Sequence, residues 1–335
     1  MTEAGARLLA CDKPPAETYD VALMDLDGVV YVGDEVIPRA PDALAAATRA
    51  GMTIEFVTNN ALRTPEEVAA KLTALGVEAT PERIATSAQA AARLLADRCG
   101  PHARVLVAGG NGLLAAVAAA GLASVDSADD EPAAVVLGYD PTLDYQRLAE
   151  AALAVRRGAL FVACNRDKTM PTSRGPLAGT GALSALVETA SGSAPLVAGK
   201  PEPALHRESV RRSGADHPLV VGDRLDTDIE GARRADTPSL LVLTGVTDLP
   251  TLAAARPEHR PDLLSRDVGG LLDPHPPARD GCCGDADARV EGGHVRVRAG
   301  TGFDVVRAGI TAAWAYLDAG HDPAGVDALD SFLDA

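Results

Sequence analysis

The chain reads VALMDLDGVV at residues 21–30. Four apolar residues, typical of a buried β-strand, lead directly into Asp25, Asp27 and Gly28. In an extended chain residues i and i+2 point the same way, so both carboxylates are expected to face one place at the carboxyl edge of a sheet. Ligands bind at that edge in open α/β sheets, where an ionised carboxylate can act as nucleophile and its neighbour can transfer protons. A solvated acidic turn would explain the DLDG letters equally well.

Similar apolar runs recur along the chain and alternate with helical patterns. Strands are predicted at residues 21–24, 53–57, 105–108, 134–137, 160–163, 196–198, 219–221 and 240–243. Thr64, Pro65 and Glu67 predict the start of a helix with a capping box, and Gly76 predicts its end. Continuous apolar strands separated by helices are typical of an α/β fold with a mainly parallel sheet.

Three further segments place polar groups after predicted strands. Thr58, Asn59 and Asn60 end one strand, and their side chains can donate hydrogen bonds to phosphoryl oxygens. Lys200 follows another strand in a fixed GKPEP turn and would supply a cation. Residues 220–229, VVGDRLDTDI, end a third strand in three acids, which suit Mg²⁺. A helix N-terminus would explain one of these acids but not all three.

Composition and charge exclude several functions. The chain has 335 residues, with 47 acids against 31 bases and a formal charge of −16. That balance argues against nucleic-acid and anionic-membrane partners, which need basic surface. The N-terminus lacks the pattern of a signal peptide and the longest apolar stretch is too short to span a bilayer, so a cytoplasmic location is expected. Because the chain as a whole is acidic, a site for an anionic substrate would have to supply its own positive charge. Lys200, one of only four lysines, is a candidate for that charge.

The four polar segments, in this order, resemble the haloacid dehalogenase (HAD) superfamily of phosphotransferases. The resemblance implies a Rossmann-like core in which Asp25 is the nucleophile that forms an aspartyl-phosphate and Asp27 is the general acid and base. It implies that Lys200 is the stabilising cation. It also implies Mg²⁺ as cofactor, bound by Asp25, the backbone carbonyl of Asp27 and Asp223, with Asp228 supporting the metal site.

The spacing of the motifs implies an inserted domain. About 140 residues separate Thr58 from Lys200, whereas a minimal crossover and strand need on the order of 30. The chain therefore resembles the type IIA members, with a HAD core at residues 1–83 and 190–268 and an α/β cap of type C2 at residues 84–189. These members include NagD-like, pyridoxal phosphate, phosphoglycolate and glycerol 3-phosphate phosphatases.

Five residues are expected to contact the substrate. By the resemblance Thr58 and Asn59 bind the transferring phosphoryl group, and Asn60 lies beside them. The cap of type IIA members carries a substrate-facing segment that matches NRDKTMP at residues 165–171, from which Asp167 and Met170 are chosen. The expected partner is a small phosphorylated metabolite.

The resulting expectation is an Mg²⁺-dependent phosphomonoesterase that acts on glycerol 3-phosphate, with greatest similarity to the actinobacterial glycerol 3-phosphate phosphatases. Phosphoglycolate, pyridoxal phosphate or a broad range of esters are alternatives. A dehalogenase would not need Asp27, since halide leaves without a proton. A non-catalytic scaffold or regulatory protein should have lost at least one of Asp25, Asp27, Lys200 and Asp223, and all four are present.

The end of the chain follows a different pattern. Residues 272–284 are rich in proline and glycine and predict a linker, and residues 288–299 predict a hairpin that turns at Gly292 and Gly293. An apolar stripe from Phe303 to Leu317 predicts an amphipathic helix. A hairpin and one helix are marginal alone, so this extension (residues 269–335) is expected to pack on the main body or on a second subunit, which would make a homodimer. Its role, and that of Cys282 and Cys283, is left open.

Overall fold

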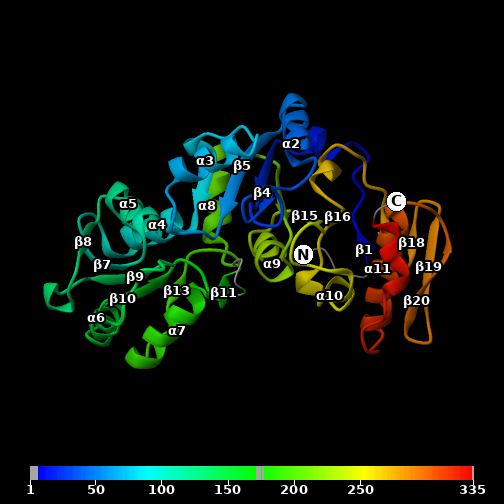
Figure 1. The fold of residues 1–335 in the computed structure, drawn as a ribbon. Coiled ribbons are helices and arrows are strands. Elements are labelled where there is room, and N and C mark those ends of the chain that lie inside the picture. Colours follow the sequence, from blue (N-terminus) through cyan, green and yellow to red (C-terminus); the bar gives the residue numbers. More distant parts are fainter. Residues whose placement is uncertain (1–6, 171–174, 176, 334–335) are drawn as a thin grey trace. The chain divides into compact units, whose positions relative to one another are not determined.

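The computed structural model describes residues 7–170, 175 and 177–333. Its contacts divide the chain into two compact units. Figure 1 labels the helices and strands of both. The first unit consists of Met1–Glu55, Leu75–Val77 and Ser213–Ala335, and the second consists of Phe56–Ala74 and Glu78–Arg212. This division groups residues by contact and differs from the expected core, cap and extension, whose boundaries stay a prediction.

A parallel sheet forms the centre of the first unit. Its strand order is β16-β15-β14-β2, made of β2 (Val21–Met24), β14 (Pro218–Gly222), β15 (Ser239–Val242) and β16 (Leu263–Ser265). All residues of β2, β15 and β16 are buried, as their continuous apolar sequences predict. In the register of β2 and β14, Met24 is opposite Val221. The strands therefore end at the same level, and the acids that follow them come to one edge.

Short elements complete this part of the first unit. They are α1 (Pro15–Thr18), β3 (Tyr31–Val32), β4 (Glu35–Val36), α2 (Ala40–Arg49), a π-helical turn (Leu225–Ile229), α9 (Glu230–Arg234) and α10 (Leu249–Ala253). Strand β5 (Thr53–Thr58) runs from the first unit into the second, where its last residues pair in parallel with β6 (Ile84–Thr86).

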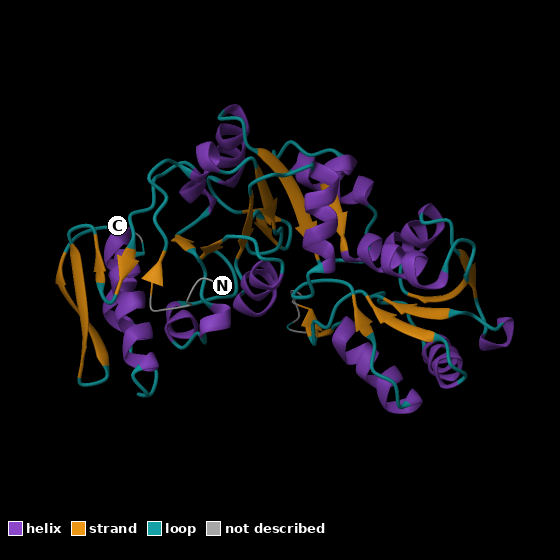
Figure 2. Ribbon diagram, turned by 180° about the vertical axis from the view of Figure 1, so that it is seen from behind, coloured by secondary structure: helices purple, strands orange, loops and turns teal. Residues whose placement is uncertain are grey.

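The second unit contains another parallel sheet, with strand order β13-β10-β9-β7-β8. Helices α4 and α5 lie on one side of this sheet and α6 and α7 on the other (Figures 1 and 2). Its strands are β7 (Arg104–Ala108), β8 (Ala123–Val125), β9 (Ala134–Leu137), β10 (Leu160–Ala163) and β13 (Leu196–Val197). Its helices are α3 (Pro65–Ala74), α4 (Ser87–Cys99), α5 (Asn111–Ala119), α6 (Tyr145–Arg156), α7 (Thr180–Ser191) and α8 (Ala204–Ser213).

The predicted capping box opens α3. The backbone N–H of Thr64 donates to the carboxylate of Glu67 at 2.8 Å, and the N–H of Glu67 donates to Oγ1 of Thr64 at 3.3 Å. The two residues thus satisfy each other's backbone donors at the point where the helix begins. The α/β fold with parallel sheets is as the sequence predicts.

The C-terminal extension corrects one prediction. The hairpin and helix are present as β19 (Ala286–Glu291), β20 (His294–Ala299) and α11 (Phe303–Asp318). The linker prediction is wrong, because the segment contains β17 (Ala278–Arg279) and β18 (Cys282–Cys283), which join an antiparallel sheet of order β1-β17-β18-β19-β20. Strand β1 (Arg7–Leu8) comes from the other end of the chain, so the proline and glycine residues turn the chain between short strands that a local pattern does not reveal.

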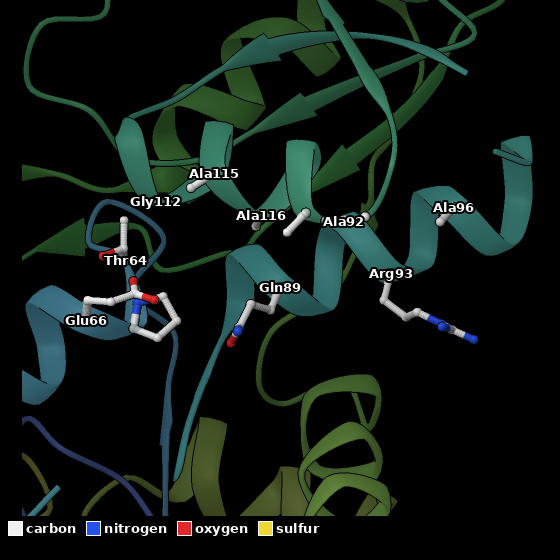
Figure 3. A pocket seen from close by; sticks show the side chains of 12 residues that line it. Thr64, Glu66, Gln89, Ala92, Arg93, Ala96, Gly112, Ala115 and Ala116 are labelled. Carbon is white, nitrogen blue, oxygen red and sulfur yellow. The ribbon is translucent and has the colours of Figure 1, made fainter. Parts of the chain in front are cut away.

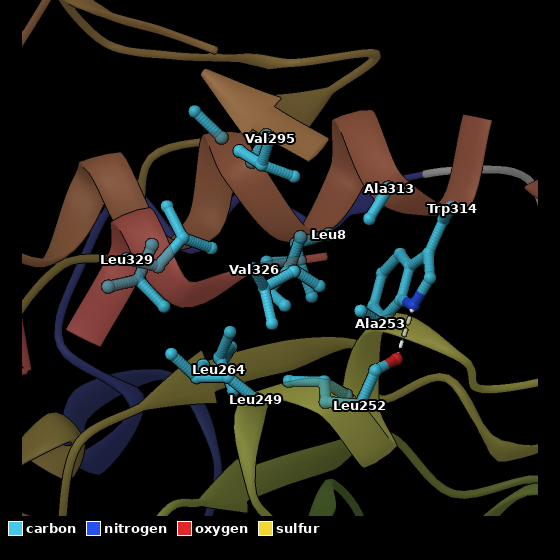
Figure 4. Packing of buried hydrophobic residues seen from close by; sticks show 14 of the residues in the cluster. Leu8, Leu249, Leu252, Ala253, Leu264, Val295, Ala313, Trp314, Val326 and Leu329 are labelled. Atoms are coloured by element: carbon cyan, nitrogen blue, oxygen red, sulfur yellow. Dashed lines mark hydrogen bonds between the residues drawn. The ribbon is translucent and has the colours of Figure 1, made fainter. Parts of the chain in front are cut away.

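Helix α11 carries the core that joins this sheet to the rest of the first unit. Trp314 is completely buried, and its indole N–H donates to the carbonyl of Leu252 in α10 at 2.7 Å (Figure 4). Leu264 of β16 and Val295 of β20 belong to the same buried cluster. The extension therefore packs on the main body, one of the two expected outcomes. Among the described residues no helix is both long and apolar enough to span a membrane.

Candidate active site

The loop after β2 carries Asp25 and Asp27, and the expectation that both carboxylates face one place stays a prediction. Asp25 is partly buried, Leu26 between them is buried, and Asp27 is exposed. The backbone N–H of Asp25 donates to the carbonyl of Val221 at 2.9 Å, which ties the backbone that carries the first carboxylate to β14. Gly28 has φ 84°, a left-handed conformation that favours glycine, and its N–H donates to the carbonyl of Tyr31 at 2.8 Å.

Three carboxylates converge in the first unit. Asp25, Asp223 and Asp228 each offer an oxygen, and these oxygens lie within 4.8 Å of one another. Asp223 and Asp228 are both completely buried. Oδ2 of Asp223 accepts the N–H of Val246 at 2.6 Å, and Oδ2 of Asp228 accepts the N–H of Arg224 at 3.1 Å. We define Asp25, Asp223 and Asp228 as the acid cluster.

Glycines leave the space that the acid cluster occupies. A Cβ atom at Gly28 or Gly245 would collide with the carboxylate of Asp223, and one at Gly222 would collide with the carboxylate of Asp228. The chain thus keeps glycine at three positions from different segments around two buried carboxylates. This close approach of backbone fixes where the carboxylates point.

The acid cluster fits a hard divalent cation. Buried carboxylates at this separation repel one another, and burying them costs free energy unless positive charge compensates. Oxygen donors of this type are the ligands of Mg²⁺. The carboxylate of Asp27 is not a member of the cluster. Asp226, the third acid of the VVGDRLDTDI segment, is exposed and pairs with Arg224 at 3.0 Å.

In the second unit the structure brings Asn59, Asp167 and Lys200 together. Oδ1 of Asn59 accepts the backbone N–H of Lys200 at 2.8 Å, and Nδ2 of Asn59 donates to the carbonyl of Lys200 at 3.2 Å. The same Nδ2 donates to Oδ2 of Asp167 at 3.3 Å. Three residues chosen separately from the sequence therefore form one hydrogen-bonded group.

Lys200 is buried, with 3% of its surface exposed, and its Nζ donates to the carbonyl of Val57 at 3.3 Å. Lysine is almost never buried to this extent without a polar partner. A Cβ atom at Gly199 would collide with the side chain of Asn59 and the carbonyl of Cys164. Glycine before the lysine thus lets the backbone pass close to Asn59.

The remaining predicted substrate residues lie on nearby segments of the same unit. Thr58 ends β5, is buried, and accepts the N–H of Asn60 on its hydroxyl oxygen at 3.1 Å. Oδ1 of Asn60 accepts the N–H groups of Leu62 and Arg63, so its side chain shapes the following turn. Met170 is half-buried in β11 (Thr169–Met170), which pairs with β12 (Leu177–Ala178). Pro171, the end of the substrate-facing segment, lies outside the described residues.

Two residues outside the predicted site set hold Asn59, and one of them, Asn165, belongs to the segment expected to face the substrate. The hydroxyl of Ser87 donates to the carbonyl of Asn59 at 2.6 Å, and Nδ2 of Asn165 donates to the same oxygen at 2.7 Å. The sequence carries a signal for the position of Ser87 but not for its bond. Thr86 and Gln89 form a capping box, which places Ser87 at the start of a helix. Which carbonyl the hydroxyl reaches follows only from the tertiary structure.

A pocket of about 320 Å³ lies elsewhere in the second unit, beside the N-terminus of α3 and between α4 and α5 (Figure 3). Thr64, Glu66, Gln89 and Arg93 supply its polar lining, and alanines of α4 and α5 supply most of the remainder. None of the residues predicted for the site lines this pocket.

Comparison with known proteins identifies similar chains. Residues 22–123 match the family model described as haloacid dehalogenase-like hydrolase, and residues 197–271 match the HAD-hydrolase-like model. The chain is 49% identical over 259 residues to D-glycerol 3-phosphate phosphatase of Mycobacterium tuberculosis, a match that covers 77% of this chain and 72% of that protein. It is 38% identical over 233 residues to acid sugar phosphatase of Staphylococcus saprophyticus, covering 69% of this chain and 89% of that protein.

A solved structure matches nearly the whole chain. Glycerol phosphate phosphatase from Mycobacterium tuberculosis in complex with magnesium superposes with a TM-score of 0.85 at 42% sequence identity. The match covers 96% of this chain and 98% of that chain. The likeness therefore extends over both units.

Proposed function

Since the chain belongs to the haloacid dehalogenase-like hydrolases, we propose that it is an Mg²⁺-dependent phosphatase that hydrolyses a small phosphate ester, with glycerol 3-phosphate as the first substrate to test. The observation that carries this proposal is the acid cluster, in which three carboxylate oxygens lie within 4.8 Å of one another. Two of the three side chains are completely buried, so the arrangement is stabilised when a divalent cation is bound.

Asp25, Asp223 and Asp228 would hold the cation, and the backbone carbonyl of Asp27 stays a predicted fourth ligand. When bound, Mg²⁺ supplies positive charge that offsets both the acid cluster and the phosphate of the substrate. The magnesium complex of the similar mycobacterial phosphatase supports this choice of metal.

The chemistry on the chain's own residues is a double displacement. A carboxylate oxygen of Asp25 attacks phosphorus in line, the bond from phosphorus to the ester oxygen breaks, and Asp27 gives its proton to the departing alkoxide. A water molecule then attacks the aspartyl-phosphate, and Asp27 takes the proton of that water. Inorganic phosphate leaves and Asp25 is restored. The exposure of Asp27 suits a residue that exchanges protons with water.

Lys200 is proposed to neutralise charge on the phosphoryl group. The transition state spreads negative charge over the phosphoryl oxygens, so a fixed cation lowers its free energy more than it lowers that of the substrate. A buried lysine tied at its backbone is suited to that task, because it does not reorganise during the reaction. Thr58, Asn60, Asp167 and Met170 stay predicted substrate contacts.

The substrate class rests on similarity. Identity to D-glycerol 3-phosphate phosphatase favours glycerol 3-phosphate, and identity to acid sugar phosphatase favours sugar phosphates as a second candidate. Phosphoglycolate, pyridoxal phosphate and 4-nitrophenyl phosphate complete the set that a screen must include.

A phosphate-release screen over these esters, with Mg²⁺ and with chelator, tests the proposal. We expect release that requires Mg²⁺ and a kcat/KM for glycerol 3-phosphate above that for the other esters. Equal rates on all esters would leave a generalist phosphatase, and release of halide from haloacids in place of phosphate would overturn the proposal.

The Asp25→Asn variant tests the covalent step. Asparagine keeps the shape but not the nucleophile, so kcat should fall by more than about 10³-fold while the fold is retained. Asp226→Asn is the matched control. Asp226 lies in the same VVGDRLDTDI segment as two acids of the cluster, but it is exposed and paired with Arg224. Its kcat should stay within about twofold of the parent. Substantial turnover by Asp25→Asn would contradict the mechanism.

The oligomeric state of the chain is a separate question from its activity. A homodimer remains the expected alternative to a monomer, and light scattering on the purified chain distinguishes them. The cytoplasmic location likewise stays a prediction, which fractionation of cells that express the chain would test.

A further inference from the structure

We propose that Asn59 is a positioning residue that holds Lys200, and that Ser87 and Asn165 extend this role by holding Asn59. The proposal rests on the proposed function, in which Lys200 neutralises the phosphoryl group. It replaces the expectation that the Asn59 side chain binds the phosphoryl group directly.

Every polar group of the Asn59 side chain already has a protein partner. Its Oδ1 accepts from the backbone N–H of Lys200, while Nδ2 donates to the carbonyl of Lys200 and to the carboxylate of Asp167. The orientation of the amide follows from these partners, since an N–H can only donate and the two oxygens can only accept. A primary amide has two N–H donors, and both are used.

The side chain of Asn59 makes one bond to the backbone N–H of Lys200 and one to its backbone carbonyl. One bond fixes its N–H and the other its carbonyl, so the backbone at Lys200 cannot shift or rotate without breaking at least one of them. The side chain that leaves this backbone is buried and ends on the carbonyl of Val57. The position of the ammonium group is therefore set by Asn59 at one end of the lysine and by β5 at the other.

Asn59 is in turn held by residues from two other segments. Ser87, the first residue of α4, and Asn165, which follows β10, both donate to its carbonyl oxygen. Ser87 is completely buried and Asn165 is 5% exposed, so neither bond is open to competition from bulk water. Oδ1 of Asn165 also accepts the N–H of Asp167 at 3.1 Å, which closes a ring through Asn59, Asn165 and Asp167.

Three substitutions remove these bonds with little change in shape. Asn59→Asp loses both Nδ2 donors and sets a carboxylate against that of Asp167. Asn165→Asp loses the donor to Asn59 but keeps an acceptor for Asp167, and Ser87→Ala loses one hydroxyl. Because a displacement of about 1 Å can cost about 10²-fold in rate, we expect kcat to fall about 30- to 100-fold for Asn59→Asp and about 3- to 10-fold for the other two. KM should change by less than about threefold.

A double-mutant cycle with Lys200→Ala separates positioning from general structural damage. If the three residues act through Lys200, their substitution in the Lys200→Ala background should lower kcat by less than about twofold. The affinity for inorganic phosphate with Mg²⁺, measured by calorimetry, gives the same cycle without turnover. There each substitution should weaken phosphate binding by no more than the roughly threefold change allowed for KM, and only when Lys200 is present.

Ser184→Ala is the matched control for Ser87→Ala. Ser184 is 1% exposed, lies in the same unit, and donates to the carbonyl of Gly181 at 3.0 Å. It should lower the melting temperature about as much as Ser87→Ala while kcat stays unchanged, and circular dichroism confirms that each variant is folded.

The outcomes of the double-mutant cycle distinguish failure of the positioning role from failure of the proposed function. Equal losses with and without Lys200, in kcat or in phosphate affinity, would overturn the positioning role. A parent chain that is inactive on phosphate esters, or a Lys200→Ala variant as active as the parent, would refute the proposed function instead.

Discussion

The guanidinium of Arg260 holds the carboxylate of Asp318 through two hydrogen bonds, Nη1 to Oδ2 at 2.7 Å and Nη2 to Oδ1 at 2.6 Å. Arg260 is 2% exposed and stacks on Trp314, with its Cζ 5.2 Å from the centre of the ring. Its Nε donates to the carbonyl of Ala255. Asp318 is the last residue of α11, so this pair fastens the end of the C-terminal helix to the main body.

The stability of the chain should depend on this pair in a pH-dependent way. The hydrogen bond from Arg260 lowers the pKa of Asp318 below its ordinary value. The carboxylate is 38% exposed, so water screens the pair, and Asp318→Asn should lower the free energy of unfolding by about 1–2 kcal/mol at pH 7.

The sign of the pH effect follows from the lowered pKa. The contribution of the ionised carboxylate is complete above its unfolded pKa of about 3.9 and is lost as the pH falls through the lower folded value. Denaturant unfolding at several pH values should therefore show a constant gap between parent and variant from pH 5 to 8 that closes below pH 4. As control, Asp97→Asn removes the exposed pair with Arg93 and should change stability by less than about 0.5 kcal/mol. A gap that does not shrink as the pH falls below 4 would contradict the assignment.

Gly28 and Gly33 form a matched pair for testing the acid cluster. Both have positive φ, 84° and 61°, so alanine costs roughly 1–2 kcal/mol of backbone strain at either position. Only at Gly28 would the added Cβ meet the carboxylate of Asp223, while at Gly33 it would meet nothing within 4 Å. Gly28→Ala should therefore weaken Mg²⁺ binding at least about tenfold in calorimetry, and Gly33→Ala should leave it unchanged. Equal Mg²⁺ affinities of the two variants would count against the cluster as the metal site.

Removal of the metal should invert the effect of Asp25→Asn on stability. Without a divalent cation the three carboxylates repel one another, so the neutral asparagine should raise the melting temperature, by roughly 2–4 °C if the gain is about 1 kcal/mol. With saturating Mg²⁺ the parent gains more from binding than the variant does, and the order should reverse. Thermal unfolding of both proteins in chelator and in Mg²⁺ measures this crossing. Parallel shifts would show that Asp25 does not contact the metal.

The cysteines should differ in reactivity according to burial. Burial raises the pKa of the Cys164 thiol, and burial together with the nearby charge of Asp304 raises that of Cys283 to about 12. Only the thiolate reacts readily, so both should resist iodoacetamide in the folded chain, whereas exposed Cys282 should be modified first. Mass spectrometry of peptides from native and unfolded protein checks this order. Early modification of Cys164 would contradict its burial.

The sequence by itself determined most strands of the two parallel sheets and pointed to the acids that converge in the first unit. Apolar runs such as residues 134–137 and 160–163 match β9 and β10, because buried parallel strands need continuous apolar residues. The acids after two such strands also converge as expected, since neighbouring parallel strands end at one edge.

Only the tertiary structure decided how distant residues hold one another. Ser87, Asn165 and Lys200 reach Asn59 from three separate segments, and β1 completes a sheet made mostly by the other end of the chain. Such contacts depend on which strand ends meet after packing, and no periodicity in a local stretch encodes that. The sequence indicated Asn59 as a substrate contact, which stays a prediction. The hydrogen bonds of its folded environment support the proposal that it fixes Lys200.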